Sequence, residues 1–176
     1  MQAGLSKRKL YALRDGGHIE LLSRGIYRSI DAGPADVDLL ATAIRIPKAT
    51  LCLTSALARH DLSDDIPQQI DLAIPRGTRA PALNAPVLWH RFDPDAFELG
   101  RDPFPIGEGL SIGIYSPERS VIDVFRMRDI QGEDVAIEAL KRWLRRKGNQ
   151  AAALLKMAAR FPRALPSLRK ALQILA

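Results

Sequence analysis

The amino-acid sequence predicts an α+β fold in which strands and helices alternate first and helices alone follow. β-branched and aromatic runs recur up to residue 116, and only helical periodicity is found from Pro117 onward. With 176 residues, 47% of them hydrophobic and 26% charged, the chain is long enough to bury a core of ordinary globular composition. Changes of pattern divide it into residues 1–30, 31–130 and 131–176.

The first segment predicts a helix followed by a β-hairpin. Ser6 can cap a helix over residues 5–15, and the Gly pair that follows supplies a stop signal just beyond its last turn. The run HIELLSRGIYRSI suits two short strands joined by a tight turn at Arg24-Gly25. On this pattern the segment is a helix with a hairpin directly after it.

The middle segment predicts short strands mixed with helices. A helix over residues 34–46 should begin at Pro34 and end before Pro47, and ATLCLTSALARHDL changes from a strand-like to a helical pattern by Ser55. A turn at Ile66-Pro67 separates this run from the strands. The candidate strands are QIDLAIP, PVLWHRF and LSIGIYS, and the stretch between the last two is rich in Pro, Gly and Asp, which predicts a loop.

The last segment predicts helices alone. Helical periodicity runs through residues 117–129, 133–147, 150–161 and 166–175, with Gly or Pro in each interval.

The charge is uneven along the chain, although the net value is only +6. Basic residues outnumber acidic ones by six to two in residues 1–30 and by thirteen to six in residues 111–176, whereas acidic residues lead by twelve to seven in between. Local positive density makes an anionic partner plausible, nucleic acid first, although a solvated basic surface is the simpler alternative.

The sequence contains little that would support a metal, a cofactor or secretion. Cys52 is the only cysteine, and His18, His60 and His90 lack the spacing of metal ligands. No signal peptide and no apolar run long enough to span a bilayer is found. We therefore expect a cytoplasmic protein without a bound metal or cofactor and without a membrane association.

The opening helix and hairpin suggest DNA binding. A helix with a basic, aromatic-bearing side, followed by a Gly-turned hairpin, suits entry into the major groove with the hairpin beside the backbone. The same pattern also fits an amphipathic helix that packs beside the hairpin without any ligand. The candidates for DNA contact are Lys7, Arg8, Tyr11, Arg14, Arg24 and Arg28.

The run G-L-S-x3-L-x2-L-x2-G-x7-R-G-I-Y resembles the recognition helix and wing of the winged helix-turn-helix in AbiEi-family antitoxins. Residues 54–75 resemble that family's small-residue helix leading into a Pro turn and a strand, and residues 116–129 resemble its Pro-x-Arg-x-hydrophobic-x-Asp helix. Members usually carry two further helices before the recognition helix, whereas only three residues precede Gly4 here. The resemblance thus predicts a partial winged helix-turn-helix ahead of the mixed domain.

What the resemblance implies is the antitoxin and DNA-binding autorepressor of a type IV toxin-antitoxin operon. Its partners would be double-stranded operator DNA and, functionally, a nucleotidyltransferase-like toxin that it need not touch. A homo-oligomer is compatible with this role.

The helix over residues 133–147 offers a second basic surface. Its apolar residues occupy one arc, and the opposite arc carries Lys141, Arg142, Arg145 and Arg146. Cations near a helix C-terminus also stabilise its dipole, so a purely structural role is equally compatible. A second hypothesis follows, in which the chain is an interaction module that binds no DNA and neutralises a toxin or docks on a partner through this surface.

Catalysis is not expected. Ser55, His60 and Asp61 are close in sequence but lack a nucleophile elbow, and His60 is better explained as a helix-end residue with a structural hydrogen bond. Asp64, Asp65 and Asp71 raise a third hypothesis, a metal-dependent nuclease. The strand after Asp71 lacks the Glu-x-Lys of such sites, and the first two aspartates suit a turn before Pro67.

Overall fold

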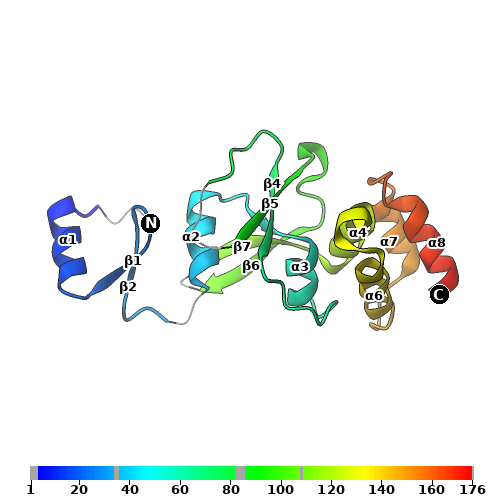
Figure 1. Ribbon diagram of the computed structural model, residues 1–176, viewed down its shortest axis with the longest axis horizontal. Coiled ribbons are helices and arrows are strands. Elements are labelled where there is room, and N and C mark those ends of the chain that lie inside the picture. Colours follow the sequence, from blue (N-terminus) through cyan, green and yellow to red (C-terminus); the bar gives the residue numbers. More distant parts are fainter. Residues whose placement is uncertain (1–3, 34–35, 82–85, 108, 176) are drawn as a thin grey trace.

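The structure is a computed structural model that describes residues 4–33, 36–81, 86–107 and 109–175. It is elongated, with the N-terminal helix and hairpin at one end, a five-stranded sheet in the middle and the C-terminal helices at the other end (Figure 1). The mixed α+β class and the helical C-terminal section predicted from the sequence are confirmed. Among the described residues, no helix combines the length and the apolar character needed to cross a membrane.

The N-terminal element consists of helix α1 (Lys7–Asp15) and a hairpin of β1 (Ile19–Ser23) and β2 (Ile26–Ser29). The Ser6 side chain accepts a hydrogen bond from the Lys9 N–H at 3.3 Å, so the predicted cap is confirmed. The two strands pair antiparallel, and Gly25 in the turn between them has φ 78°. That conformation favours glycine and explains why the turn falls there.

The central sheet has the strand order β5-β4-β3-β7-β6 and is mixed. The short strand β3 pairs antiparallel with β4 and parallel with β7, and β4 pairs parallel with β5. The bounds are β3 (Thr50–Leu51), β4 (Ile70–Pro75), β5 (Val87–Phe92) and β7 (Leu110–Tyr115), which match the strand candidates of the sequence.

Strand β6 (Arg101–Gly107) corrects the sequence prediction, which gave this stretch as a loop. The strand lies at the edge of the sheet and pairs antiparallel with β7, with Pro103 opposite Gly113 and Pro105 opposite Ser111. Proline is compatible with an edge strand because the missing N–H can face away from the neighbour. Gly113 also leaves room for Arg101, whose Nε donates to the Thr50 hydroxyl at 2.7 Å.

Helices α2 (Val37–Arg45) and α3 (Leu53–Arg59) belong to the sheet domain. The Asp36 carboxylate caps α2 by accepting from the Leu39 N–H at 3.2 Å, while the predicted start at Pro34 lies outside the described residues. The helix ends before Pro47, as predicted, and α3 begins two residues earlier than its pattern indicated.

The C-terminal section packs on the other end of the sheet domain. It contains α4 (Pro117–Arg126), α5 (Arg128–Gln131), α6 (Glu133–Leu144), α7 (Ala151–Ala158) and α8 (Leu165–Leu175). The predicted helix over residues 117–129 is therefore divided at Met127, and the other predicted helices are found with small shifts at their ends.

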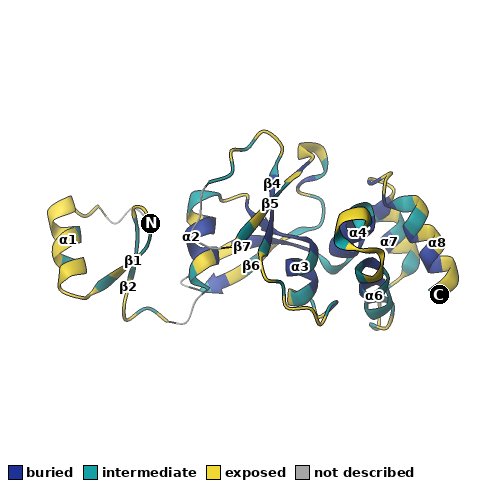
Figure 2. Ribbon diagram, viewed as in Figure 1, coloured by how far each residue is buried: buried dark blue, intermediate teal, exposed yellow. Residues whose placement is uncertain are grey.

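Two hydrophobic clusters form the core, seen as buried stretches in Figure 2. The smaller one lies between α2 and the sheet, around Leu39, Leu40 and Ile114. The larger one joins α3 and α4 to the C-terminal helices through residues such as Leu57 and Trp143. Helix α4 is thus packed from both sides, which explains why seven consecutive residues of it are buried.

A buried ion pair on α4 lies within the larger cluster. The Arg119 Nε donates to the Asp123 carboxylate at 2.9 Å, and neither side chain is more than 1% exposed. The Arg119 Nη1 also donates to the Ala96 and Leu99 carbonyls, each at 2.7 Å. Burial raises the pKa of the Asp123 carboxyl, while the neighbouring guanidinium groups oppose that shift. The pair therefore joins α4 to the loop that follows β5.

Aromatic rings enclose the same guanidinium group. Its carbon lies 4.3 Å from the ring centres of both Tyr115 and Phe161. A Cβ on Gly100 would come within 2.9 Å of the Arg119 Cβ, so this backbone is held close to α4. Strand β7, the loop after β5 and the segment between α7 and α8 all converge on Arg119.

Replacing Asp123 with Ala should lower the free energy of unfolding by about 3–5 kcal/mol, because it leaves buried guanidinium charge without its carboxylate. Urea denaturation followed by circular dichroism measures the change. The control is Asp102→Ala, which removes an exposed carboxylate from β6 and should alter stability by less than about 0.5 kcal/mol. Equal stability of the two variants would contradict a central role for the pair.

Candidate nucleic-acid interface

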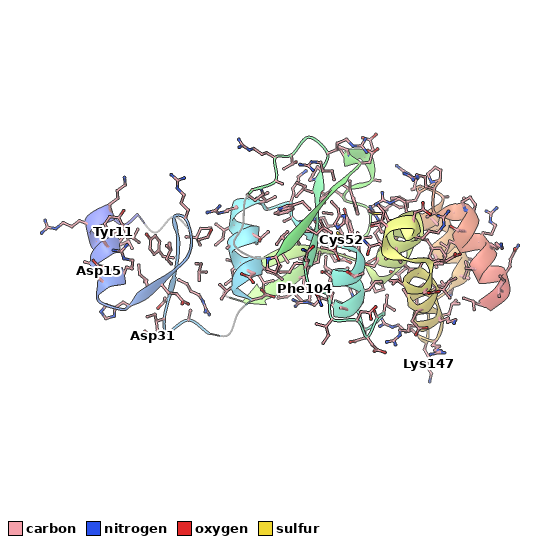
Figure 3. All side chains as sticks on the ribbon, in the orientation of Figure 1. Tyr11, Asp15, Asp31, Cys52, Phe104 and Lys147 are labelled. Carbon is pink, nitrogen blue, oxygen red and sulfur yellow. The ribbon has the colours of Figure 1, made fainter. Side chains whose placement is uncertain are left out.

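Helix α1 presents its cations to solvent at one end of the molecule. Lys7, Arg8 and Lys9 are exposed, and no residue of α1 is buried. Figure 3 shows Tyr11 and Asp15 on this helix, away from the sheet domain, and Tyr11 is 46% exposed. At about 100° per residue, Lys7, Arg8 and Tyr11 fall on one side of the helix. On this helical spacing the three predicted contact residues share one side of α1.

Arg14 lies on the same side but is engaged within the helix. Its Nη2 is 2.7 Å from the Asp15 carboxylate, and its guanidinium carbon lies 5.0 Å from the centre of the Tyr11 ring. Both groups are exposed, so the pair is weak and could exchange for a phosphate contact. Arg14 therefore contacts the Tyr11 ring, and its own side chain remains 44% exposed.

The tip of the hairpin carries Arg24, whose side chain is exposed. The backbone carbonyl of Arg24 accepts a hydrogen bond from the Arg45 Nη2 on α2 at 2.9 Å. Leu22 on β1 packs against the smaller hydrophobic cluster. The hairpin is therefore attached to the sheet domain on one side, while α1 extends beyond it.

Arg28 lies in a different environment from the other predicted contact residues. Its side chain is 12% exposed, its Nη2 donates to the Ala32 carbonyl at 3.3 Å and also to that of Gly33, and its Nη1 is 3.7 Å from the Glu20 carboxylate. These contacts join the two strands of the hairpin to the segment that leads into α2. Arg28 thus holds the hairpin in place within the protein.

The second predicted basic surface, on α6, is partly neutralised by contacts within the chain. Arg142 forms two hydrogen bonds to the Asp64 carboxylate and one, at 2.9 Å, to Glu138, and these bonds lower the pKa of both carboxyls. Arg146 donates to the His60 carbonyl. Lys141 and Arg145 line a shallow depression with Leu144 and Leu175. The cations that remain available on α6 are therefore fewer than its sequence indicates.

The residues considered for catalysis make structural contacts. The ring Nε2 of His60 is 2.7 Å from the Tyr115 carbonyl, which confirms the predicted hydrogen bond at the end of a helix. The Asp71 carboxylate is held by His90, at 2.8 Å, and by the Thr54 hydroxyl. The Ser55 hydroxyl accepts from the Asp71 N–H at 2.8 Å. Across the described parts of the chain, no three His, Cys, Asp or Glu side chains are grouped so as to hold a metal ion.

A cavity of about 760 Å³ was not predicted from the sequence. It lies between the end of β5, the junction of α4 and α5, and the segment between α7 and α8. We call it the arginine cavity, because its lining includes Arg76, Arg91, Arg126, Arg160 and Arg163. Only Arg160 and Arg163 are near each other in sequence, so their spacing was the one signal that could have indicated it.

Comparison with protein-family models and with curated proteins finds no match for this chain. Among solved structures, the fold is similar to that of the RV2827C protein from Mycobacterium tuberculosis, with a TM-score of 0.56 and 18% sequence identity. The match covers 98% of this chain and 70% of that chain. At this identity the likeness concerns the arrangement of the elements, and it extends over nearly the whole of the present chain.

Replacing Arg28 with Met should loosen the hairpin, because the Ala32 and Gly33 carbonyls lose a charged donor. We expect amide hydrogen exchange in β1 and β2 to become about tenfold faster, which corresponds to about 1.4 kcal/mol in the opening equilibrium. Arg24→Ala is the control, since it removes an exposed cation from the same hairpin and keeps the carbonyl that Arg45 binds. Unchanged exchange in the Arg28 variant would show that its contacts do not hold the hairpin.

Proposed function

We propose that the chain is a DNA-binding transcriptional autorepressor and the antitoxin of a type IV toxin-antitoxin operon, acting in the cytoplasm beside a nucleotidyltransferase-like toxin. The observation that carries the DNA-binding part is the exposed side of α1, where Lys7, Arg8 and Tyr11 face solvent at the end of the molecule. Arg24, at the tip of the following hairpin, adds a fourth accessible group.

The physical argument rests on shape and charge together. An α-helix fits the major groove of B-DNA, and cations at its N-terminal turn can reach phosphates or base edges. A hairpin attached beside it can contact the neighbouring backbone. Because Arg45 and Arg28 hold the hairpin from the protein side, it would meet the duplex already ordered.

The antitoxin part rests on the resemblance of residues 54–75 and 116–129 to AbiEi-family antitoxins. In the fold these two stretches contribute α3, β4 and α4, which pack together around the larger hydrophobic cluster. These stretches are distinct from α1, so repression and toxin neutralisation should be separable by mutation.

The alternative is an interaction module that binds no DNA. It is supported by Lys141 and Arg145, which lie beside Leu144 and Leu175 on the C-terminal section. In that case a partner protein with acidic groups would dock there, and substitutions in α1 would have no effect on the function.

Replacing both Lys7 and Arg8 with Ala should weaken binding to the duplex that lies upstream of the protein's own reading frame. If each residue contacts one phosphate, the slope of log affinity against log salt should become shallower by about 2. Gel-shift titrations at several salt concentrations measure both quantities. The matched control is Lys147→Ala with Lys156→Ala, two exposed cations; Lys147 is labelled in Figure 3, and Lys156 lies on α7, at the far end of the molecule from α1 in Figure 1.

A reporter assay and toxin co-expression separate the two parts of the proposal. The Lys7 and Arg8 double variant should lose repression of its own promoter while still protecting cells from the toxin. If wild type and variant bind the duplex with the same affinity and salt slope, the assignment of α1 is wrong and the interaction module becomes the better account.

A further inference from the structure

The arginine cavity carries an excess of positive charge that the DNA-binding proposal does not use. Five arginines line it against three carboxylates, those of Asp93, Asp95 and Asp129. Asp93 is already engaged, because its carboxylate accepts from the Asp95 N–H at 3.0 Å and caps the short 3-10 helix η1 (Pro94–Ala96). The cavity is therefore electropositive even though the surrounding segment of sequence is acidic.

The floor of the cavity holds the strongest local imbalance. Arg126 is 18% exposed, and its Nη2 lies 3.0 Å from Asp123 Oδ1. The same carboxylate already neutralises Arg119, which is buried. Two guanidinium groups thus share one buried carboxylate, so these two arginines carry one positive charge more than Asp123 neutralises. A charge withdrawn from water without a counter-charge is costly, so an anion in the cavity would relieve it.

The guanidinium group of Arg126 is also held in a fixed place. Its carbon lies 4.3 Å from the ring centre of Phe92 and 5.7 Å from that of Phe161. Its Nε is buried and has no hydrogen-bond partner among the described residues, and its Nη2 faces Asp123, so contact with a ligand would come from the exposed part of the guanidinium group. An arginine that is held in place by stacking is suited to binding a phosphate.

The rim adds cations from separate segments. Arg76 follows β4, Arg91 lies on β5, and Arg160 and Arg163 flank the buried Phe161 between α7 and α8; all four are exposed. Trp89, half-buried on β5, lines the same cavity and offers an apolar ring. The arginines around the cavity mouth could bind phosphate groups, and the Trp89 ring could stack on a nucleobase, so the lining suits a ligand that contains both.

We propose that the arginine cavity binds a terminal phosphate group, with Arg126 at its floor and Arg160 and Arg163 at its rim, and that its ligand is a nucleotide polyphosphate. The recessed position of Arg126 is the reason for a terminal group. A phosphate within a nucleic-acid strand has nucleotides on both sides and cannot enter the cavity end-on. The 5′-phosphate of a strand is the other source of the same chemistry.

This site is independent of α1, which lies at the opposite end of the molecule from α4 and α7 (Figure 1). It goes beyond the proposed repressor function, because it gives the protein a small-molecule ligand. Failure of one proposal does not entail failure of the other, since different residues carry them.

Isothermal titration of the whole protein with ATP and with inorganic pyrophosphate tests the proposal. Both should bind to the wild type, and the Arg160→Ala, Arg163→Ala double variant should lose at least tenfold in affinity. Arg126→Met should lose as much, and it should still fold because Asp123 keeps its bond to Arg119. Arg169→Ala with Lys170→Ala, exposed on α8 and outside the cavity lining, is the matched control and should bind as the wild type does.

A short oligothymidylate with and without a 5′-phosphate distinguishes the two sources. Binding that requires the 5′-phosphate supports the site with a strand end as ligand, and binding of ATP and pyrophosphate alone supports it with a free nucleotide. No binding of pyrophosphate and ATP at millimolar concentration, or equal affinity of the cavity variants and the control, would each overturn the proposal.

Discussion

The carboxylate of Asp123 is the point on which most of the fold depends. It is buried on α4 between the guanidinium groups of Arg119 and Arg126. Arg119 carries the connection further, to the carbonyls after β5 and to the rings of Tyr115 and Phe161. A polar contact of this kind is directional, so it sets how the sheet meets the C-terminal helices, which apolar packing alone would leave less specified.

Some cationic side chains are bonded to other groups within the protein, and others are exposed to solvent. Arg28, Arg119 and Arg142 are bonded to carbonyls or carboxylates and act as connectors between elements. The cations of α1 and those around the arginine cavity remain accessible, and they lie at separate places on the molecule. The overall charge of +6 therefore understates how strongly two particular regions could attract anions.

Local patterns were sufficient to predict most of the fold. The Ser6 cap, the Gly-containing turn and the helical periodicity after Pro117 each act within a few residues, so the sequence displays them directly. Strand β6 was missed because proline usually excludes a strand, and only its edge position makes it acceptable. Contacts over long distances in sequence, such as Arg142 with Asp64, and the gathering of the cavity arginines from four segments follow from the tertiary fold and have no local signature.

The two prolines of β6 also decide how this protein can associate with other chains. Alternate residues of a strand direct their N–H groups to the same side of the strand. Pro103 and Pro105 therefore lack N–H groups on the same side of β6. That side faces away from β7, because the other side forms the hydrogen bonds of the ladder. The outer edge of β6 consequently offers few N–H donors to a strand of another molecule. This disfavours edge-to-edge aggregation of the protein at β6. Joining of sheets between molecules is therefore favoured at the opposite edge, where β5 is the outermost strand of the described sheet.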